Sequence, residues 1–266
     1  MSYAKADDGS RIWYEVQGAL PGVRTPLVLV QGLALDHHGW DSAISDFDDR
    51  PVILLDHRGT GGSDDQFTDD WSTRDFARDI IAVLDAAGVA RAHVYGHSMG
   101  GRIAQWLGAR HADRVVALVL GATSVGDSGG IARSARASEV LASGDPTGLT
   151  TLFYPDAWLA DHPREARRVL PSAASASAMR AHLSAANKHD GPHPGNITVP
   201  TLIIQGTDDE LTVPDNARLL ACHIDDSSLE LLDGQRHVYW IDRPDAHETV
   251  GRFLRQHDHP SDDQSP

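Results

Sequence analysis

Ser98 lies at the centre of residues 96–100, which have the sequence Gly-His-Ser-Met-Gly. An apolar run precedes this segment and a helical pattern follows it, so the serine falls at a turn between a strand and a helix. Glycines two positions away on either side let the strand and the helix approach closely. Such a turn exposes the serine hydroxyl, and the amide of Met99 at the helix N-terminus could donate to a developing oxyanion. We predict that Ser98 is a nucleophile; a serine that only caps the helix is the alternative.

A serine hydroxyl needs an adjacent base at neutral pH, and that base needs an acid to orient it. At a turn of this kind, the acid and then the histidine follow the serine along the chain. His237 fits the base because it follows the last predicted strand and a turn glycine. The chain has 15 histidines, so an ordinary loop histidine is the alternative. The position of His237 nevertheless predicts that it is the base for Ser98.

Two adjacent aspartates compete for the role of the acid. Asp208 and Asp209 follow the apolar run at residues 201–204, on a loop at the carboxyl end of a predicted strand. Open α/β sheets place their functional groups at such ends. Residues 121–124, which follow another predicted strand, contain no carboxylate. The acid is therefore expected at position 208 or 209, and Asp208 could instead cap the next helix or face solvent.

Short apolar runs alternate with helical patterns, and these elements must position the three side chains. Most of the runs are continuous, as in strands buried on both faces of a parallel sheet, whereas the first alternates like an antiparallel strand. The predicted strands are residues 12–16, 27–30, 52–55, 92–95, 115–120, 201–204 and 229–232. The predicted helices span about residues 72–88, 103–109, 215–222 and 244–254. This alternation predicts an α/β fold with a doubly wound, mostly parallel sheet covered by helices on both faces.

Residues 125–196 interrupt the alternation. They are rich in Ala, Arg and Ser and show a helical pattern broken by prolines, with no convincing strand. An insertion of this size in a compact domain usually serves as a lid or a binding element. We therefore predict a core domain at residues 1–124 and 197–257 and an inserted helical cap at residues 125–196. The polar, proline-bearing residues 258–266 are predicted to be a disordered tail.

The charge balance excludes some classes of partner. The 266 residues include 23 Lys and Arg against 38 Asp and Glu, a formal net charge of −15. Such a chain repels nucleic acid and anionic membranes, so we expect neither as a partner. No apolar run approaches the ~20 residues that span a bilayer, and the first residues lack the apolar stretch of a secretory signal. We expect a cytoplasmic protein without an intramolecular disulfide, because Cys222 is the only cysteine.

These motifs resemble the α/β-hydrolase superfamily across nearly the whole chain. Within it, the chain is similar to the small capped hydrolases of the 3-oxoadipate enol-lactonase and bacterial carboxylesterase type. The segments that carry the resemblance are residues 27–33, 56–64, 96–101 and 206–209, together with His237. The resemblance implies an α/β-hydrolase fold with an inserted helical cap.

The resemblance also implies roles for particular residues. The Gly-x-x-Asp pattern of the family favours Asp209 over Asp208 as the acid. The backbone amides of Leu33 and Met99 would be the oxyanion-hole donors. The family usually has His-Gly where this chain has Gln31 followed by glycine. We expect Gln31 to brace that loop through different hydrogen bonds.

Candidate substrate contacts come from the loop after the first oxyanion donor and from the cap. His37 and Trp40 follow that loop, whereas Phe153 and Trp158 belong to the cap. The other apolar cap residues that could face the pocket are Leu152, Tyr154, Met179 and Leu183. No metal site is predicted, because His37 and the histidine after it are consecutive and lack carboxylates at ligand spacing.

Together these residues predict a serine hydrolase that cleaves a carboxylic ester or lactone of a small organic substrate through an acyl-enzyme. The expected partner is that small-molecule substrate, and we expect no cofactor. Two alternatives stay open, because a fold does not fix a function. A cofactor-free dioxygenase or perhydrolase would use the His–Asp pair and depend less on serine. A small-ligand receptor could keep the whole site with little turnover.

Overall fold

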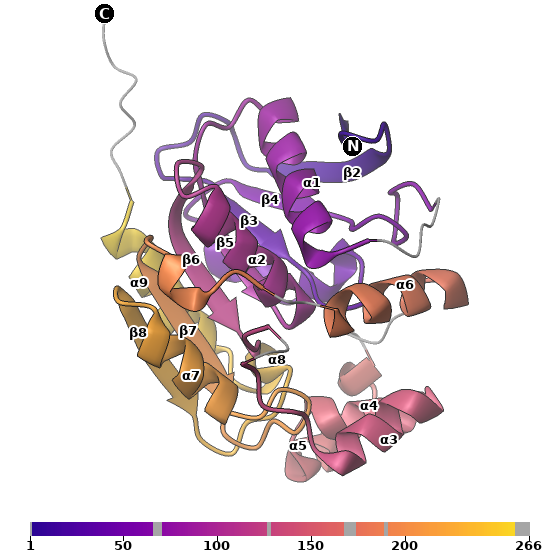
Figure 1. Cartoon of the computed structure of the whole chain (residues 1–266). Helices are drawn as coiled ribbons and strands as arrows, with labels where there is room; N and C mark the ends of the chain where they lie inside the picture. Colours follow the sequence, from indigo (N-terminus) through magenta and orange to yellow (C-terminus); the bar gives the residue numbers. More distant parts are fainter. Residues whose placement is uncertain (1, 66–70, 127–128, 168–173, 189–190, 259–266) are drawn as a thin grey trace, which may run out of the picture.

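An eight-stranded sheet forms the centre of the molecule (Figure 1). The computed structural model describes residues 2–65, 71–126, 129–167, 174–188 and 191–258. The strand order is β1-β2-β4-β3-β5-β6-β7-β8. Strands β3 to β8 are parallel to one another, and β2 is antiparallel to both of its neighbours. The strands are β1 (Ser2–Lys5), β2 (Arg11–Gln17), β3 (Leu27–Val30), β4 (Val52–Leu55), β5 (Ala92–His97), β6 (Val115–Gly121), β7 (Thr201–Gly206) and β8 (Ser227–Leu232).

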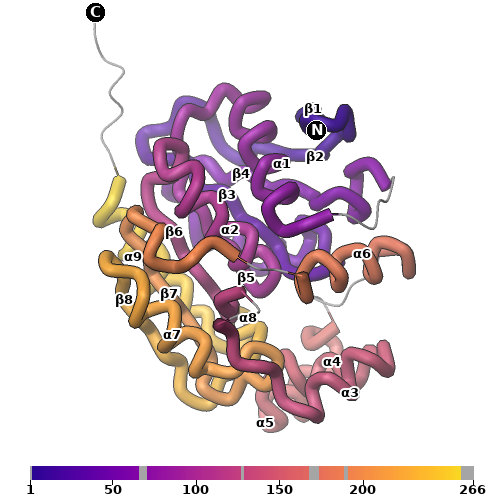
Figure 2. The backbone as a smooth tube through the Cα atoms, viewed as in Figure 1, coloured from indigo at the N-terminus to yellow at the C-terminus, as the bar shows by residue number. Residues whose placement is uncertain are grey.

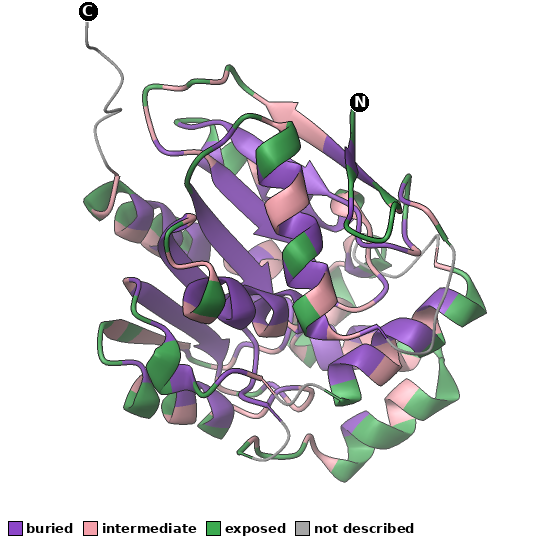
Figure 3. Cartoon of the chain, turned by 45° about the horizontal axis from the view of Figure 1, so that its top comes forward, coloured by how far each residue is buried: buried purple, intermediate pink, exposed green. Residues whose placement is uncertain are grey.

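The side chains of the central strands alternate between two apolar cores. In β3, Val28 and Val30 belong to one core, whereas Leu27 and Leu29 belong to the other. The helices that cover the cores are α1 (Thr73–Ala86), α2 (Met99–Arg110), α7 (Asp215–His223), α8 (Tyr239–Asp242) and α9 (Asp245–Gln256). The first three pack on one core and the last two on the other. Figure 3 shows the sheet as a buried band between helices that are exposed on one side. The predicted α/β fold with a doubly wound, mostly parallel sheet is therefore confirmed.

A helical insertion lies between β6 and β7. Its described residues form four α-helices and no strand. The helices are α3 (Ala135–Ser143), α4 (Pro146–Phe153), α5 (Asp156–Asp161) and α6 (Ala176–Asn187). Figure 2 shows the chain leaving the sheet after β6, passing through these helices and returning to the sheet at β7. Across the described ranges, no helix is long and apolar enough to cross a membrane.

Asp258 is the first residue of the predicted disordered tail, and the structure places it in an ordered ion-pair cluster. Its carboxylate lies 2.8 Å from Arg24, 2.9 Å from Arg50 and 3.2 Å from the imidazole of His93. Of the two arginines, Arg50 is buried and Arg24 is partly exposed, and both pair with this carboxylate. The rest of the predicted tail, residues 259–266, lies outside the described residues.

Candidate active site

Ser98 connects β5 to α2 in a backbone conformation that residues other than glycine rarely adopt, with φ 56° and ψ −119°. The turn requires glycines on both sides of the serine. A Cβ on Gly96 would collide with the carbonyl of Gly100, and a Cβ on Gly100 would collide with the carbonyl of Val30. Strain of this kind persists only where the surrounding structure enforces it. The turn places Ser98 at the wall of a cavity beyond the carboxyl end of β5.

The structure brings the three predicted side chains into one hydrogen-bond chain. The Ser98 hydroxyl lies 2.9 Å from Nε2 of His237, and Nδ1 of His237 lies 2.8 Å from Oδ2 of Asp209. They meet because β5, β7 and β8 are parallel and end at the same edge of the sheet. An ionised carboxylate can only accept, so Nδ1 carries the proton and Nε2 accepts from serine. His97 supports this arrangement, because its Nε2 donates to the carbonyl of His237 at 2.9 Å.

Asp209, and not Asp208, lies beside the imidazole. The Asp209 side chain is buried, and its Oδ1 accepts the backbone amides of Leu211 at 2.8 Å and Thr212 at 3.0 Å. Its Oδ2 accepts hydrogen bonds from the side-chain Nε2 of Gln205 at 2.9 Å and from Nδ1 of His237. Asp208 is exposed, and its carboxylate bonds only Thr207 on the same loop, at 3.1 Å. The buried carboxylate is thus held in place by several donors that fix its orientation toward His237.

The amides of Leu33 and Met99 lie at the same cavity as Ser98. Both residues line its wall, and within the described part of the chain neither amide donates a hydrogen bond. The loop before Leu33 passes close to the nucleophile, since a Cβ on Gly32 would lie 3.2 Å from Cβ of Ser98. Two unengaged backbone donors near a serine hydroxyl are the arrangement that an oxyanion hole requires.

Hydrogen bonds from three directions brace the loop that carries Leu33. The side chain of Gln31 accepts the amide of Gly32 at 2.9 Å, and Nε2 of His57 donates to the carbonyl of Gln31 at 3.0 Å. His182, from α6 of the insertion, accepts the amide of Ala34 at 3.1 Å and donates to the carbonyl of Arg58 at 2.8 Å. Ala34 needs this support because its φ is 58°. Gln31 thus bonds the loop through its own side chain.

The burial of His57 makes the stability of the protein depend on pH. Burial, reinforced by the nearby His182, lowers the pKa of His57 from 6.5 to about 4. The unfolded chain therefore takes up the proton first, and stability falls as the pH drops from 6.5 toward 4. Between pH 7.5 and 5.5, the wild type should lose about 1.4 kcal/mol more of its unfolding free energy than His57→Gln. Urea unfolding at both pH values measures the unfolding free energy of each protein, and His223→Gln, at an exposed position, is the control. Equal losses in the wild type and His57→Gln would contradict it.

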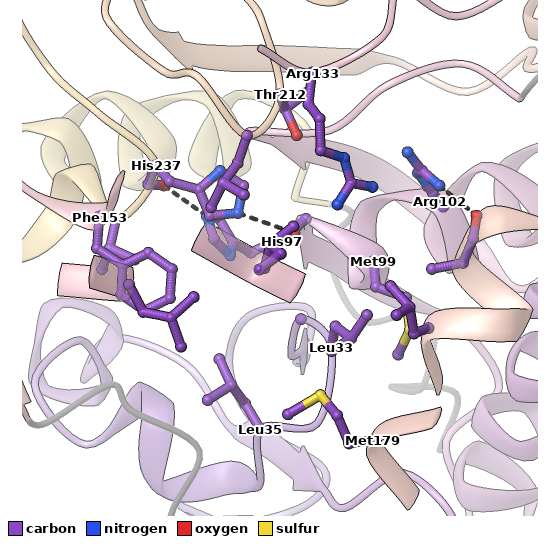
Figure 4. A pocket seen from close by; sticks show the side chains of 18 of the residues that line it. Leu33, Leu35, His97, Met99, Arg102, Arg133, Phe153, Met179, Thr212 and His237 are labelled. Carbon is purple, nitrogen blue, oxygen red and sulfur yellow. Dashed lines mark hydrogen bonds between the residues drawn. The ribbon is translucent and has the colours of Figure 1, made fainter. Parts of the chain in front are cut away.

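The cavity over Ser98 has a volume of about 280 Å³ and is mostly apolar. Figure 4 shows His237, Met99 and Leu33 around it. The insertion supplies much of the remaining wall, through Leu149, Phe153, Met179 and Leu183. Because β-strand ends and insertion helices both line this space, the insertion covers the candidate site. A cavity of this kind accommodates a small, largely apolar molecule.

One of the four predicted substrate contacts lines the cavity. Phe153 does so, and its ring stacks on the His237 imidazole with centroids 6.1 Å apart. The structure places the other three elsewhere. Trp40 is fully buried against Trp240, because the short 3-10 turn that contains it directs the indole into the core. His37 stacks on Trp13 and hydrogen-bonds Asp56 at 2.8 Å.

Trp158 lies outside the cavity because its indole stacks within the insertion, against Tyr154 and His162. Tyr154 and Leu152 are themselves fully buried in the core beneath, whereas Met179 and Leu183 line the cavity. Aromatic content alone therefore did not distinguish residues that face the substrate space from residues that hold the insertion together.

Two arginines in the cavity wall escaped sequence reasoning. Arg102 stands four residues after Ser98, on the same side of α2, so helical periodicity could have identified it. Arg133 precedes α3 in a segment without strand or motif, and no sequence signal identifies it. The described residues contain no group of three His, Cys, Asp or Glu side chains that could hold a metal ion.

The chain is similar to known proteins over most of its length. The family model described as alpha/beta hydrolase fold matches residues 25–157. A protein named "Putative carbamate hydrolase RutD" from Azorhizobium caulinodans is 31% identical over 257 residues, covering 92% of this chain and 95% of that protein. The 3-oxoadipate enol-lactonase 1 of Acinetobacter baylyi is 28% identical over 229 residues, covering 82% of this chain and 84% of the relative.

A solved structure gives the same result. The enol-lactonase from Burkholderia xenovorans LB400 superposes with a TM-score of 0.80 at 25% identity, covering 96% of this chain and all of that one. The named relatives are hydrolases, and the similarity covers most of the chain. The chain belongs to the α/β-hydrolase fold family.

Proposed function

We propose that this protein is a serine hydrolase that cleaves a carboxylic ester or lactone of a small organic molecule through an acyl-enzyme. One observation carries the proposal. Ser98, His237 and Asp209 form a continuous hydrogen-bond chain that ends at a mostly apolar cavity. The relatives support the reaction class, since their names describe a carbamate hydrolase and enol-lactonases.

In the first half of the reaction, the Ser98 oxygen attacks the carbonyl carbon while Nε2 of His237 takes the hydroxyl proton. Asp209 keeps the proton of the imidazole on Nδ1 and stabilises the imidazolium that forms. The carbonyl oxygen becomes negatively charged and accepts hydrogen bonds from the amides of Leu33 and Met99. The C–O bond to the leaving group then breaks, and His237 protonates the departing alkoxide.

In the second half, water replaces the alcohol. His237 removes a proton from the water while the water oxygen attacks the acyl carbon. The amides of Leu33 and Met99 stabilise the second oxyanion. The acyl–oxygen bond breaks, the proton on His237 returns to the Ser98 oxygen, and a carboxylic acid leaves. In a lactone the alcohol and the acid remain in one molecule, so a single hydroxy acid is released.

Covalent labelling of the nucleophile tests the proposal. A fluorophosphonate probe should form one adduct per chain on Ser98, because only an activated serine beside oxyanion donors displaces fluoride readily. Peptide mass spectrometry locates the adduct, and hydrolysis of 4-nitrophenyl acetate should disappear in proportion to labelling. The heat-denatured chain, which lacks the arrangement, should not react. An adduct on another residue with full activity retained would exclude Ser98 as the nucleophile.

A further inference from the structure

The loop that carries His237 caps the C-terminal end of α4, a helix of the insertion. The last four carbonyls of an α-helix have no partner within the helix. In α4, the carbonyl of Thr150 accepts the amide of Tyr154 at 3.1 Å, and the other three bind consecutive residues of the loop. The pairs, donor first, are Arg236 Nη1 to Thr151, the His237 amide to Leu152 at 3.4 Å, and the Val238 amide to Phe153 at 3.0 Å. The end of α4 is thus bonded directly to the candidate base.

Arg236 joins the end of α4 to the start of α5 through a single nitrogen. Besides the carbonyl of Thr151, its Nη1 donates to the carbonyl of Tyr154 at 3.0 Å and to the carboxylate of Asp156 at 2.8 Å. The Arg236 side chain is 18% exposed, whereas that of Asp156 is 79% exposed. An ion pair with so exposed a carboxylate contributes little, so the two carbonyls are the stronger reason for the position of Arg236. The dipole of α4 also favours a cation there.

The same end of α4 reaches the imidazole of His237. The ring of Phe153 stacks on that imidazole at 6.1 Å, with an angle of 26° between the two planes (Figure 4). Asp209 and Ser98 hydrogen-bond the two ring nitrogens. Two hydrogen bonds fix two points of a ring, so its tilt depends on the groups packed against it. These groups include Phe153 and His97, whose ring lies 4.8 Å from the imidazole.

We propose that Arg236 is a positioning residue for the base. It fixes the end of α4 on the loop that carries His237 and thereby holds Phe153 against the imidazole. That His237 acts as a base rests on the proposed function. Without the guanidinium, two backbone carbonyls lose this donor and the end of α4 is less firmly held. The imidazole then adopts tilts in which Nε2 no longer faces the Ser98 hydroxyl.

Substitutions at Arg236 test this role. Arg236→Gln should lower kcat for 4-nitrophenyl acetate by about 10- to 100-fold, because a small displacement of a catalytic group has an effect of this size. Its KM should change by about threefold at most, since most of the cavity wall is unaltered. Arg236→Lys should stay within about threefold of the wild-type kcat, because the contacts use one nitrogen and an ammonium offers three N–H groups.

Two control variants separate the carbonyl contacts from charge. Asp156→Asn removes only the exposed partner of Arg236 and should change kcat by about twofold at most. Arg243→Gln removes a positive charge that pairs with the exposed Asp245 and not with α4, and its kcat should also change by about twofold at most. Equal losses in Arg236→Gln and Arg243→Gln would contradict the proposal.

Two further measurements distinguish positioning from a general loss of stability. If Arg236 acts through Phe153, Arg236→Gln should lower kcat by less than about threefold in a Phe153→Leu background. The proton on Nδ1 of His237 gives a low-field NMR signal, identified by its absence in His237→Ala. This signal should weaken in Arg236→Gln through faster exchange with water and persist in Asp156→Asn. Losses that multiply in the double variant would overturn the proposal.

The NMR signal also separates failure of this role from failure of the proposed function, because it requires no turnover. If the wild type hydrolyses no ester or lactone but the signal depends on Arg236, the proposed function is wrong and the coupling to the imidazole stands. If the wild type is active and Arg236→Gln retains both its kcat and the signal, the positioning role is wrong. Thermal unfolding verifies the fold, and Arg236→Met, which keeps an apolar stem, replaces Arg236→Gln if the latter does not fold. Failure of both variants to fold would show that Arg236 stabilises the whole domain and would overturn the proposal.

Discussion

Ser98→Ala should lose about 10⁴- to 10⁶-fold in the rate of ester or lactone hydrolysis while still binding the substrate. The lost hydroxyl is the atom that forms the acyl-enzyme, so His237 has no nucleophile left to activate. The amides of Leu33 and Met99 and the cavity wall remain, and they account for the residual rate and the retained binding. Acid release in a pH-stat measures turnover, and calorimetry with an ester measures binding to the inactive variant.

His237→Ala serves as the companion variant and separates the hydrolase from its alternatives. It should lose turnover to a similar degree, because serine and histidine act as one unit. An oxygen electrode run on the same samples should record no uptake. A cofactor-free oxygenase would instead keep consuming oxygen in Ser98→Ala, since it needs mainly the histidine base. A receptor would bind its ligand tightly while the wild type turned over no ester or lactone.

Asp209→Asn should lower kcat by about 10⁴-fold, because an amide in place of the carboxylate changes which nitrogen of His237 carries the proton. In the wild type, Nδ1 of His237 donates to Oδ2 of Asp209 at 2.8 Å. The Asn amide would donate there instead and move the proton to Nε2, which then no longer accepts from Ser98. Steady-state hydrolysis of 4-nitrophenyl acetate gives kcat for each variant.

Asp208→Asn is the matched control, one position away on the same loop. Its carboxylate is exposed and contacts only Thr207, so kcat should change by no more than about threefold. The side chain of Asp209→Asn can still accept the amides of Leu211 and Thr212, which keeps the loop in place. Thermal unfolding should therefore show a folded variant. A larger loss in Asp208→Asn than in Asp209→Asn would show that Asp209 is not the acid.

The centre of the sheet was predictable because its strands are buried on both faces. Continuous apolar runs such as residues 27–30 and 52–55 have few other stable environments, and their order along the chain implies the helices between them. The strand β1 (Ser2–Lys5) was not predicted, since only one of its four residues is buried and its pairing with β2 defines it. Similarly, α8 (Tyr239–Asp242) is too short to show helical periodicity.

The site was predictable where local geometry constrains the residue type. The glycines around Ser98 indicate a tight turn, because at these positions a side chain would collide with neighbouring backbone. The local sequence therefore predicts the backbone conformation. The choice between Asp208 and Asp209 depended on resemblance, because neighbouring side chains on a loop point in directions that no periodicity specifies. Trp40 packs on Trp240 in the core, and Arg133 reaches the cavity from a segment before α3. Both placements depend on contacts between residues far apart in sequence, which leave no local signal.

His182 makes the insertion a structural part of the candidate active site and not a detachable cover. It comes from α6, yet it supports the amide of Ala34, one residue after the proposed oxyanion donor Leu33. If α6 moved away as a rigid flap, the buried groups of Ala34 and Arg58 would lose their partner, at a cost of about 1–3 kcal/mol each. If the insertion were exchanged for that of a relative, the new insertion would need a residue at this position that both accepts and donates a hydrogen bond. Without such a residue, the chimaera would gain a new pocket, but the loop that carries Leu33 would lose its support.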